Sequence, residues 1–270
     1  MVLDGWSDVN KLHTEGVILT SGSAATCALD ENEAYFEHHG IAVARGWESF
    51  LSAYPDYNFS YHLSDDAGQC ARACRILDLR HPNMIWQRCW SHQINLMVKH
   101  LLGLTVLRDA CKLAIFSAKA INASSSKWSP QLRTRSEQMY GKHRSKHIMT
   151  VGETSWNSTQ GCFYSLLCMC GACRVFAIHH QNAPKFPMTC IPWCENSFWI
   201  TLKNSELLIC PFCDASFLMQ RNTNTMAHVL LVLLHLVKHI QESCTLKYFT
   251  SFKIQILNIF ANTLTSHLCF

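Results

Sequence analysis

The stretch NFSYHLSDDAGQCARACRIL, residues 58–77, sets an apolar and aromatic run directly before two carboxylates and a helix-like segment. The run NFSYHLS has the composition of a strand, and DAGQCARACRILDL has that of a helix. Asp65 therefore falls where a strand passes into a helix. In α/β folds this junction often holds functional groups, but Asp is also an ordinary helix N-cap, and both interpretations stay open.

On the N-terminal side of this stretch, the hydrophobic pattern predicts a small β-meander followed by a helix. The first strand is predicted to end at Asp4, the second to cover residues 16–20, and the third to cover residues 23–31. Apolar and aromatic residues recur near helical spacing in residues 31–54. We therefore expect a helix that packs on the sheet.

On the C-terminal side of this stretch, the pattern predicts one more strand and then only helices. Residues 83–89 predict a strand, and residues 91–121 predict one long helix, so the predicted order is β-β-β-α-β-α-β-α. A polar, basic stretch follows Asn122 and is interpreted as a linker. Beyond it we expect helices joined by proline-containing loops, at Pro184, Pro187, Pro192 and Pro211.

The cysteine content and the apolar segments indicate a reducing compartment and no membrane span. The chain has fifteen cysteines and does not open on a charged and then apolar signal segment. Two apolar stretches, residues 165–178 and 226–240, contain charged or histidine residues and fall short of the roughly 18 residues that a span needs. We expect both to be buried helices.

Charge is distributed unevenly along the chain. Residues 1–66 contain eleven acids and two bases, whereas residues 67–270 contain eight acids and twenty-one bases. The second part therefore suits a polyanion. Its most basic segment has a single acid, Glu137, and carries two aromatic rings, Trp128 and Tyr140, among six bases: Lys127, Arg133, Arg135, Lys142, Arg144 and Lys146. Such a segment can contact phosphates and stack on bases, but a solvated loop explains it equally well.

Two acids at predicted strand ends form the first candidate site. If the strands that end at Asp4 and Asp65 are neighbours, their carboxylates lie close enough to share divalent cations. Two such ions can activate water and stabilise a leaving oxygen in phosphodiester cleavage. The alternative is that both acids have turn and cap roles.

Cys89 and His92 form a second candidate, since a Cys-x-x-His pair can supply half of a zinc site. The other cysteines and histidines do not complete a standard finger spacing, so we favour buried thiols with a capping histidine and expect no structural zinc. On the segment 226–240, His228, His235 and His239 share one helical face. That pattern favours packing over metal binding.

Five segments, in order, resemble the successive blocks of hAT-superfamily transposase-like proteins. The resemblance is to the domain of unknown function in their ribonuclease-H-like part, and it runs from about Leu3 to about Ile240. The segments are LDGWSD, LSDDAGQCARACRILDLRHP, RCWSHQINLMVKHLL, GETSWNS and PFCDASFLMQRNTNTMAHVLLVLLHLVKH. Five blocks in order are more specific than any single motif.

The resemblance implies an α/β fold, with a ribonuclease-H-like mixed sheet core followed by a mostly α-helical insertion region. It implies that Asp4 and Asp65 match the first two of three acids that bind Mg or Mn for DNA strand cleavage. Cys89 and His92 match the motif at the entrance to the insertion, and Trp156 matches a ring that stacks on a flipped base. It also implies DNA or another transposase-like chain as partner, and a nuclear location, with no small-molecule substrate.

By this resemblance, the core covers residues 1–122, a basic linker 123–150 and part of the insertion 151–242, while residues 243–270 do not resemble the family. The chain contains no Glu-Arg pair, the motif that carries the third acid, and Ser155 replaces the Arg expected before Trp156. No zinc-finger module precedes the core. We therefore expect a truncated, catalytically inactive protein. A DNA-binding or protein-interaction module, or a decayed element without a selected role, are the alternatives.

Overall fold

The computed structural model describes residues 2–7, 13–21, 24–30, 39–65, 68–143, 147–152, 156–221 and 225–268. It describes only the backbone, and not the side chains, of residues 2–7, 13–21, 24–30, 156–157, 226 and 265–268. The chain divides into two compact units, Met1–Gln93 with Thr263–Phe270, and Ile94–Asn262. It is a mostly helical α/β protein, in agreement with the predicted α/β class.

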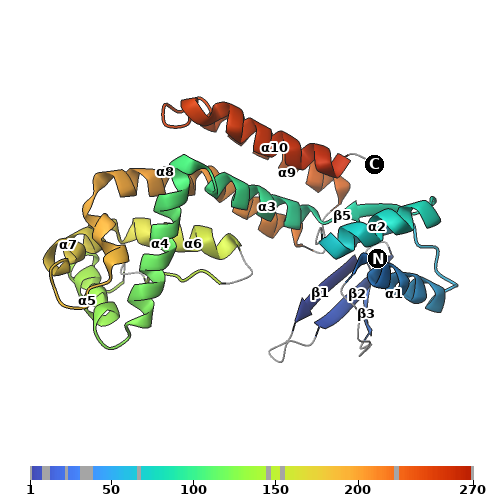
Figure 1. Ribbon diagram of the computed structural model, residues 1–270, viewed down its shortest axis with the longest axis horizontal. Helices are drawn as coiled ribbons and strands as arrows, with labels where there is room; N and C mark the ends of the chain where they lie inside the picture. The colour runs from blue at the N-terminus through green and yellow to red at the C-terminus, as the bar shows by residue number, and fades with distance from the viewer. Residues whose placement is uncertain are drawn as a thin grey trace. The chain divides into compact units, whose positions relative to one another are not determined.

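The first unit contains a five-stranded mixed sheet in the order β3-β2-β1-β4-β5 (Figure 1). Antiparallel pairs join β1 to β2 and β2 to β3, whereas β4 pairs in parallel with β1 on one side and with β5 on the other. The parallel pairs require crossovers, and helices supply them. The strands are β1 Val2–Ser7, β2 His13–Ser21, β3 Ala24–Asp30, β4 Tyr61–Ser64 and β5 Ile85–Arg88.

The predicted order of strands and helices is confirmed, but several boundaries were wrong, among them the start of β2, which is His13 and not residue 16. β1 continues past Asp4 to Ser7 because its pairing with β2 extends to Ser7 and His13. The helix predicted for residues 31–54 is α1, which begins at Gly40 and ends at Ala53. Residues 31–38 of that prediction lie outside the described residues.

Helices α1 and α2 (Gly68–Arg80) lie side by side in the first unit (Figure 1). Their apolar faces bury Trp47 and Leu77 against Trp86 of β5. The two helices approach closely at Gly40, where a Cβ atom would lie 2.5 Å from the Cβ of Arg72. Any larger residue at position 40 would therefore push the helices apart.

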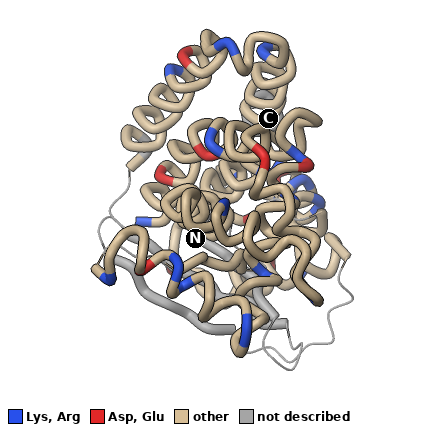
Figure 2. Tube along the Cα trace, turned by 90° about the vertical axis from the view of Figure 1, so that its left-hand side faces the viewer, with Lys and Arg blue, Asp and Glu red and all other residues tan. Residues whose placement is uncertain are grey.

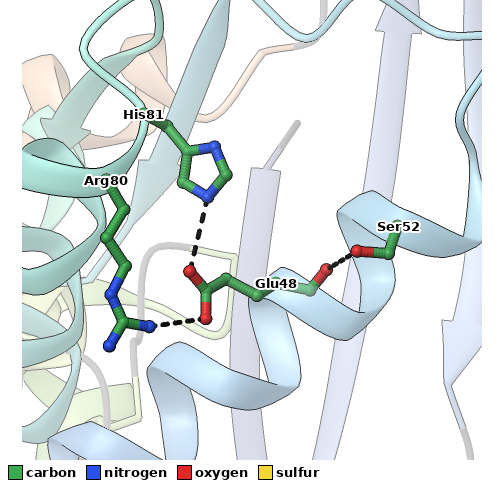
Figure 3. Close-up of polar contacts among 4 residues, drawn as sticks. All are labelled: Glu48, Ser52, Arg80 and His81. Atoms are coloured by element: carbon green, nitrogen blue, oxygen red, sulfur yellow. Dashed lines mark hydrogen bonds and ion pairs between the residues drawn. The ribbon is translucent and has the colours of Figure 1, made fainter.

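A polar contact joins the same two helices at their solvent side (Figure 3). Glu48 of α1 places Oε2 2.7 Å from Nη1 of Arg80 and Oε1 3.5 Å from Nε2 of His81. Ser52 Oγ donates to the backbone carbonyl of Glu48 at 2.8 Å. The Glu48 carboxylate thus contacts both the last residue of α2, Arg80, and the residue that follows it, His81.

The long helix predicted for residues 91–121 is in fact two helices, α3 (Trp90–Leu102) and α4 (Thr105–Ala123). Gly103 follows the last residue of α3, and Leu104 has an extended ψ of 134°. A glycine readily ends a helix, and the hydrophobic periodicity continues across it, so the pattern alone hid the break. The two units divide at Gln93 and Ile94, earlier than the predicted end of the core at residue 122.

The second unit is built from helices. Within it, Cys111 Sγ of α4 donates to Ser205 Oγ of α8 at 3.4 Å, and Ser216 Oγ of α8 donates to Asn95 Oδ1 of α3 at 3.2 Å. Its elements after α4 are α5 Trp128–Tyr140, α6 Trp156–Cys168, α7 Cys170–His180, η1 Met188–Cys194, α8 Asn196–Met219, α9 Met226–Ser243, η2 Thr250–Phe252 and α10 Lys253–Leu268, whose end belongs to the first unit.

The stretch predicted as a linker, residues 123–150, contains helix α5. This part of the prediction was wrong because the bases concealed a buried stripe of Trp128, Leu132 and Ser136, each four residues apart. The stripe packs on α7. The basic residues are therefore held on a helix, and a solvated loop is excluded for residues 128–140.

Two expectations about the later helices also need correction. Pro211 lies inside α8 and not in a loop. In this helix, burial of neighbours such as Phe212 offsets the roughly 3 kcal/mol cost of a helical proline. Helix α9 is buried on one face only. Leu236 and Ile240 are 0% and 1% exposed, whereas Leu230, Leu231 and Leu234 are more than half exposed, at 58%, 63% and 65%.

Candidate functional site

The two predicted acids lie on neighbouring strands of the sheet. β1 and β4 are parallel, and Val2 pairs with Leu63. Because parallel strands advance in step, Asp4 and Asp65 occupy matching positions two residues further on. Asp65 directly follows the last residue of β4, as predicted, and Asp4 pairs with Gly16 of β2 on its other side. The side chain of Asp4 lies outside the described part of the chain.

The carboxyl ends of β4 and β5 meet at the same edge of the sheet. Cys89 N, just after β5, donates to the carbonyl of Ser64 at 2.7 Å. Ser64 Oγ in turn donates to the backbone carbonyl of Asp65 at 3.2 Å and lies 3.4 Å from Cys74 Sγ of α2. This edge of a parallel sheet is where α/β proteins commonly bind ligands.

Cys89 therefore lies beside the end of β4, and His92 lies in the first turn of α3. Gln93 N donates to the carbonyl of Cys89 at 3.0 Å, so Cys89 begins the helix. Among the side chains that the structure describes, no three His, Cys, Asp or Glu residues are grouped to hold a metal ion. Because the side chain of Asp4 is not among the described side chains, a metal site shared by Asp4 and Asp65 stays a prediction.

The described cysteines are free thiols, and several are buried. Burial raises the pKa of Cys162 and of Cys190 to about 12, and it raises that of Cys173 well above the ordinary value. A thiol is nucleophilic and binds metals only as the thiolate. These cysteines therefore act as small apolar core residues.

Of the basic residues predicted to contact DNA, the structure describes three. Arg133 Nε lies 2.9 Å from Oε1 of Glu137, one turn along α5, so its charge is paired. Arg135 of α5 is half-buried, and Lys142 is exposed. Arg144 and Lys146 lie outside the described residues.

The buried aromatic ring of the basic segment, that of Trp128, does not serve as a stacking platform. Trp128 is 4% exposed, and its Nε1 donates to the carbonyl of Lys185 at 3.1 Å. Tyr140 Oη accepts a hydrogen bond from Ala172 N of α7 at 3.3 Å. Both residues hold α5 to the rest of the unit, and because the indole of Trp128 is buried, a stacking role for Trp128 was wrong. The ring of Tyr140 is half-buried, and its stacking role stays a prediction. The ring of Trp156, at the start of α6, lies outside the described side chains.

Two of the three histidines of α9 have structural roles, while the third, His235, is exposed. His228 Nδ1 accepts from Thr225 N at 3.1 Å and so closes a capping box at the start of the helix. His239 Nε2 lies 3.1 Å from the carbonyl of Leu208 and 3.3 Å from Ser243 Oγ. Packing and capping therefore account for both residues.

The structure brings together, next to α5, basic residues that lie in separate segments of the sequence. His179 and His180 end α7, and Lys185 lies in the loop that follows, where it joins α5 through Trp128. Figure 2 shows that Lys and Arg outnumber Asp and Glu along the described trace. No single motif signals this grouping, because residues 127 and 185 are 58 positions apart.

Comparison with known protein families found no family that matches this chain, and comparison with curated proteins found no match. Among the described residues, no single helix is long and apolar enough to cross a membrane. The segments Ser158–Cys168 and Cys170–His180 reach that length only as a pair, with a bend of 73° between them.

Proposed function

We propose that this chain is a transposase-derived, ribonuclease-H-like protein related to hAT transposases, and that it binds DNA without cutting it. The observation that carries the proposal is the parallel pairing of β1 and β4, which gives Asp4 and Asp65 matching positions. The strand order β3-β2-β1-β4-β5 supports it further, because a ribonuclease-H-like core has three antiparallel strands followed by parallel ones.

The donor chemistry of the two acids suits Mg or Mn, since both ions prefer carboxylate oxygen ligands. Asp4 and Asp65 would hold such an ion, which would activate water or stabilise a leaving oxygen. Strand cleavage in the family uses three acids, and the 270 residues contain no Glu-Arg pair to carry the third. By the resemblance, these 270 residues match two of the three acids, so the proposal assigns binding, and not cutting, to them.

Binding would use the basic residues of the second unit. Residues 94–262, which form this unit, contain seven acids and seventeen bases. Cations that contact phosphates release bound counterions, so such binding weakens as salt is added. The proposed nuclear location rests on the same resemblance.

The test is a pair of assays on the purified chain. In the first, a fluorescent DNA duplex is titrated at increasing salt, and we expect the Kd to rise steeply. In the second, supercoiled plasmid is incubated with Mg or Mn, and we expect no nicking by the chain or by its Asp65→Asn variant. Nicking by the natural chain that Asp65→Asn abolishes would overturn the absence of cutting. Absence of DNA binding at low salt would overturn the binding role.

A protein-interaction module, with another transposase-like chain as partner, is the second candidate function. It is favoured by the exposed apolar face of α9, which presents Leu230, Leu231 and Leu234. Association through this face would be insensitive to salt, in contrast to DNA binding. Light scattering across the same salt series distinguishes the two.

A further inference from the structure

Three segments of the second unit bring cationic and protonatable side chains together at the contact between α5 and α7. Lys127 immediately precedes α5, and its Nζ lies 4.1 Å from the centroid of the Trp128 ring and 3.4 Å from the carbonyl of Pro184. The ring of His180 packs on the same indole, with centroids 5.4 Å apart, and the His179 ring is 5.0 Å from that of His180. The start of α5, the end of α7 and the following loop thus share one surface.

Acidic residues are absent from the sequence segments that form this surface. Residues 110–136 and 154–194 contain no Asp or Glu. Glu137, the next acid along α5, is bonded to Arg133. Lys127, Arg135, His179 and Lys185 are therefore not in ion pairs among the described residues, and an anion from outside the chain would be their natural counterion.

The charged groups act on one another at close range. Burial, together with the positive charges of His179, Arg135 and Lys127, lowers the pKa of His180. Arg135 acts on this imidazole from α5, and Lys127 does so from the position just before α5. His179 lies next to it in α7. Lys185 lies in the loop beyond, and η1 contributes Cys190 and Cys194 but no acid. An anion bound here would relieve the mutual repulsion and favour the protonated form of His180, as does the C-terminal end of α7.

The loop that carries Lys185 is held in a defined, strained conformation. Lys185 has φ 65°, in the left-handed region that residues other than glycine rarely adopt. The hydrogen bond from Trp128 Nε1 holds its carbonyl, and its side chain is exposed. A lysine at a position whose backbone favours glycine indicates a functional role for the Lys185 side chain.

We propose that Lys127, Arg135, His179, His180 and Lys185 form a phosphate-binding site that holds the DNA backbone and binds it more tightly as pH falls. This inference deepens the proposed DNA binding and rests on it. Phosphate oxygens accept from guanidinium, ammonium and imidazolium groups alike. Protonation of His180 would add a positive charge to the site, and because burial and the neighbouring positive charges lower the pKa of His180, this protonation is favoured by acid pH and by a bound anion.

The experiment measures the Kd for a fluorescent DNA duplex at pH about 6 and about 8. Arg135→Gln and Lys185→Gly should each weaken binding by about three- to tenfold at low salt and reduce the salt slope by about one. The natural chain should bind more tightly at the lower pH, and the double change His179→Gln with His180→Gln should remove most of that dependence. Lys119→Gln, the loss of an exposed base on α4, is the control and should change the Kd less than twofold.

Lys185→Gly separates loss of binding from loss of folding, because glycine relieves the backbone strain at this position. Its thermal midpoint should equal or exceed that of the natural chain. If the natural chain binds DNA but both single variants bind as tightly as it does, the site is wrong while the proposed function stands. If the natural chain does not bind DNA at all, the proposed function and this site both fail.

Discussion

The imidazole of His62 lies 4.5 Å, centroid to centroid, from the indole of Trp86 on the adjacent strand β5. The ring of Trp47 is also close, with its centroid 4.6 Å from that of the imidazole. The imidazole is fully buried, and neither of its nitrogens has a hydrogen-bond partner among the described residues. Burial lowers the pKa of His62 to about 3, so the ring is neutral in the folded protein.

This burial predicts a loss of stability in acid. Between the ordinary pKa of 6.5 and about 3, the unfolded chain binds a proton on His62 that the folded chain does not. The free energy of unfolding should therefore fall as the pH decreases through this window, with a limiting contribution from His62 of about 1.4 kcal/mol per pH unit. Above pH 6.5 this residue should contribute no pH dependence.

The measurement is urea unfolding at several pH values for the natural chain and for His62→Phe. Phenylalanine places an aromatic ring in the same buried position but cannot bind a proton. The difference in stability between the two proteins should therefore change in favour of the variant as the pH falls. A constant difference across the window would show that His62 is not the titrating group.

Glu48 and Trp47 should differ greatly in their contribution to stability, although they are adjacent in α1. The Arg80 side chain of the ion pair with Glu48 is 53% exposed, so Glu48→Gln should cost less than about 1 kcal/mol. Trp47 is 3% exposed, and Trp47→Ala should cost about 3–5 kcal/mol. Chemical denaturation measures both values. Equal costs would contradict the packing of α1 described above.

Trp128→Phe should lower stability and weaken DNA binding only modestly, because the indole positions Lys127, His180 and Lys185 but does not itself stack on a base. The substitution removes the hydrogen bond to the carbonyl of Lys185, worth about 1 kcal/mol, and part of the packing on Phe176 and Phe186. The indole is buried and has no free face for a base. Thermal unfolding and DNA titration check the two halves of this prediction. A large loss of affinity in a folded variant would mean that the indole contributes more to the phosphate site than positioning its neighbours.

The two faces of α9 should respond differently to substitution. Leu231 is 63% exposed, so Leu231→Gln should change the free energy of unfolding by no more than about 0.5 kcal/mol. Leu236 is fully buried, so Leu236→Ala should cost about 2–5 kcal/mol. Denaturation of the two variants tests the orientation of the helix. A large cost for Leu231→Gln would mean that its side chain is covered in solution.

Local pattern was sufficient for the order of elements in the first unit and for the position of Asp65 at the end of β4. Strand and helix periods are properties of a few consecutive residues, so a single sequence reveals them. The same locality explains the errors. The period continued across Gly103, so one helix was predicted in place of two, and the bases of residues 127–146 concealed the apolar stripe of α5.

The sequence by itself therefore determined the alternation of strands and helices and the uneven distribution of charge. Only the tertiary structure decided which of those elements touch. It aligned Asp4 with Asp65 through the parallel pairing of β1 and β4, and it joined Trp128 to Lys185 through one hydrogen bond across 57 positions. The physical reason is that such contacts depend on how distant apolar faces pack, and no local period of the chain encodes that choice.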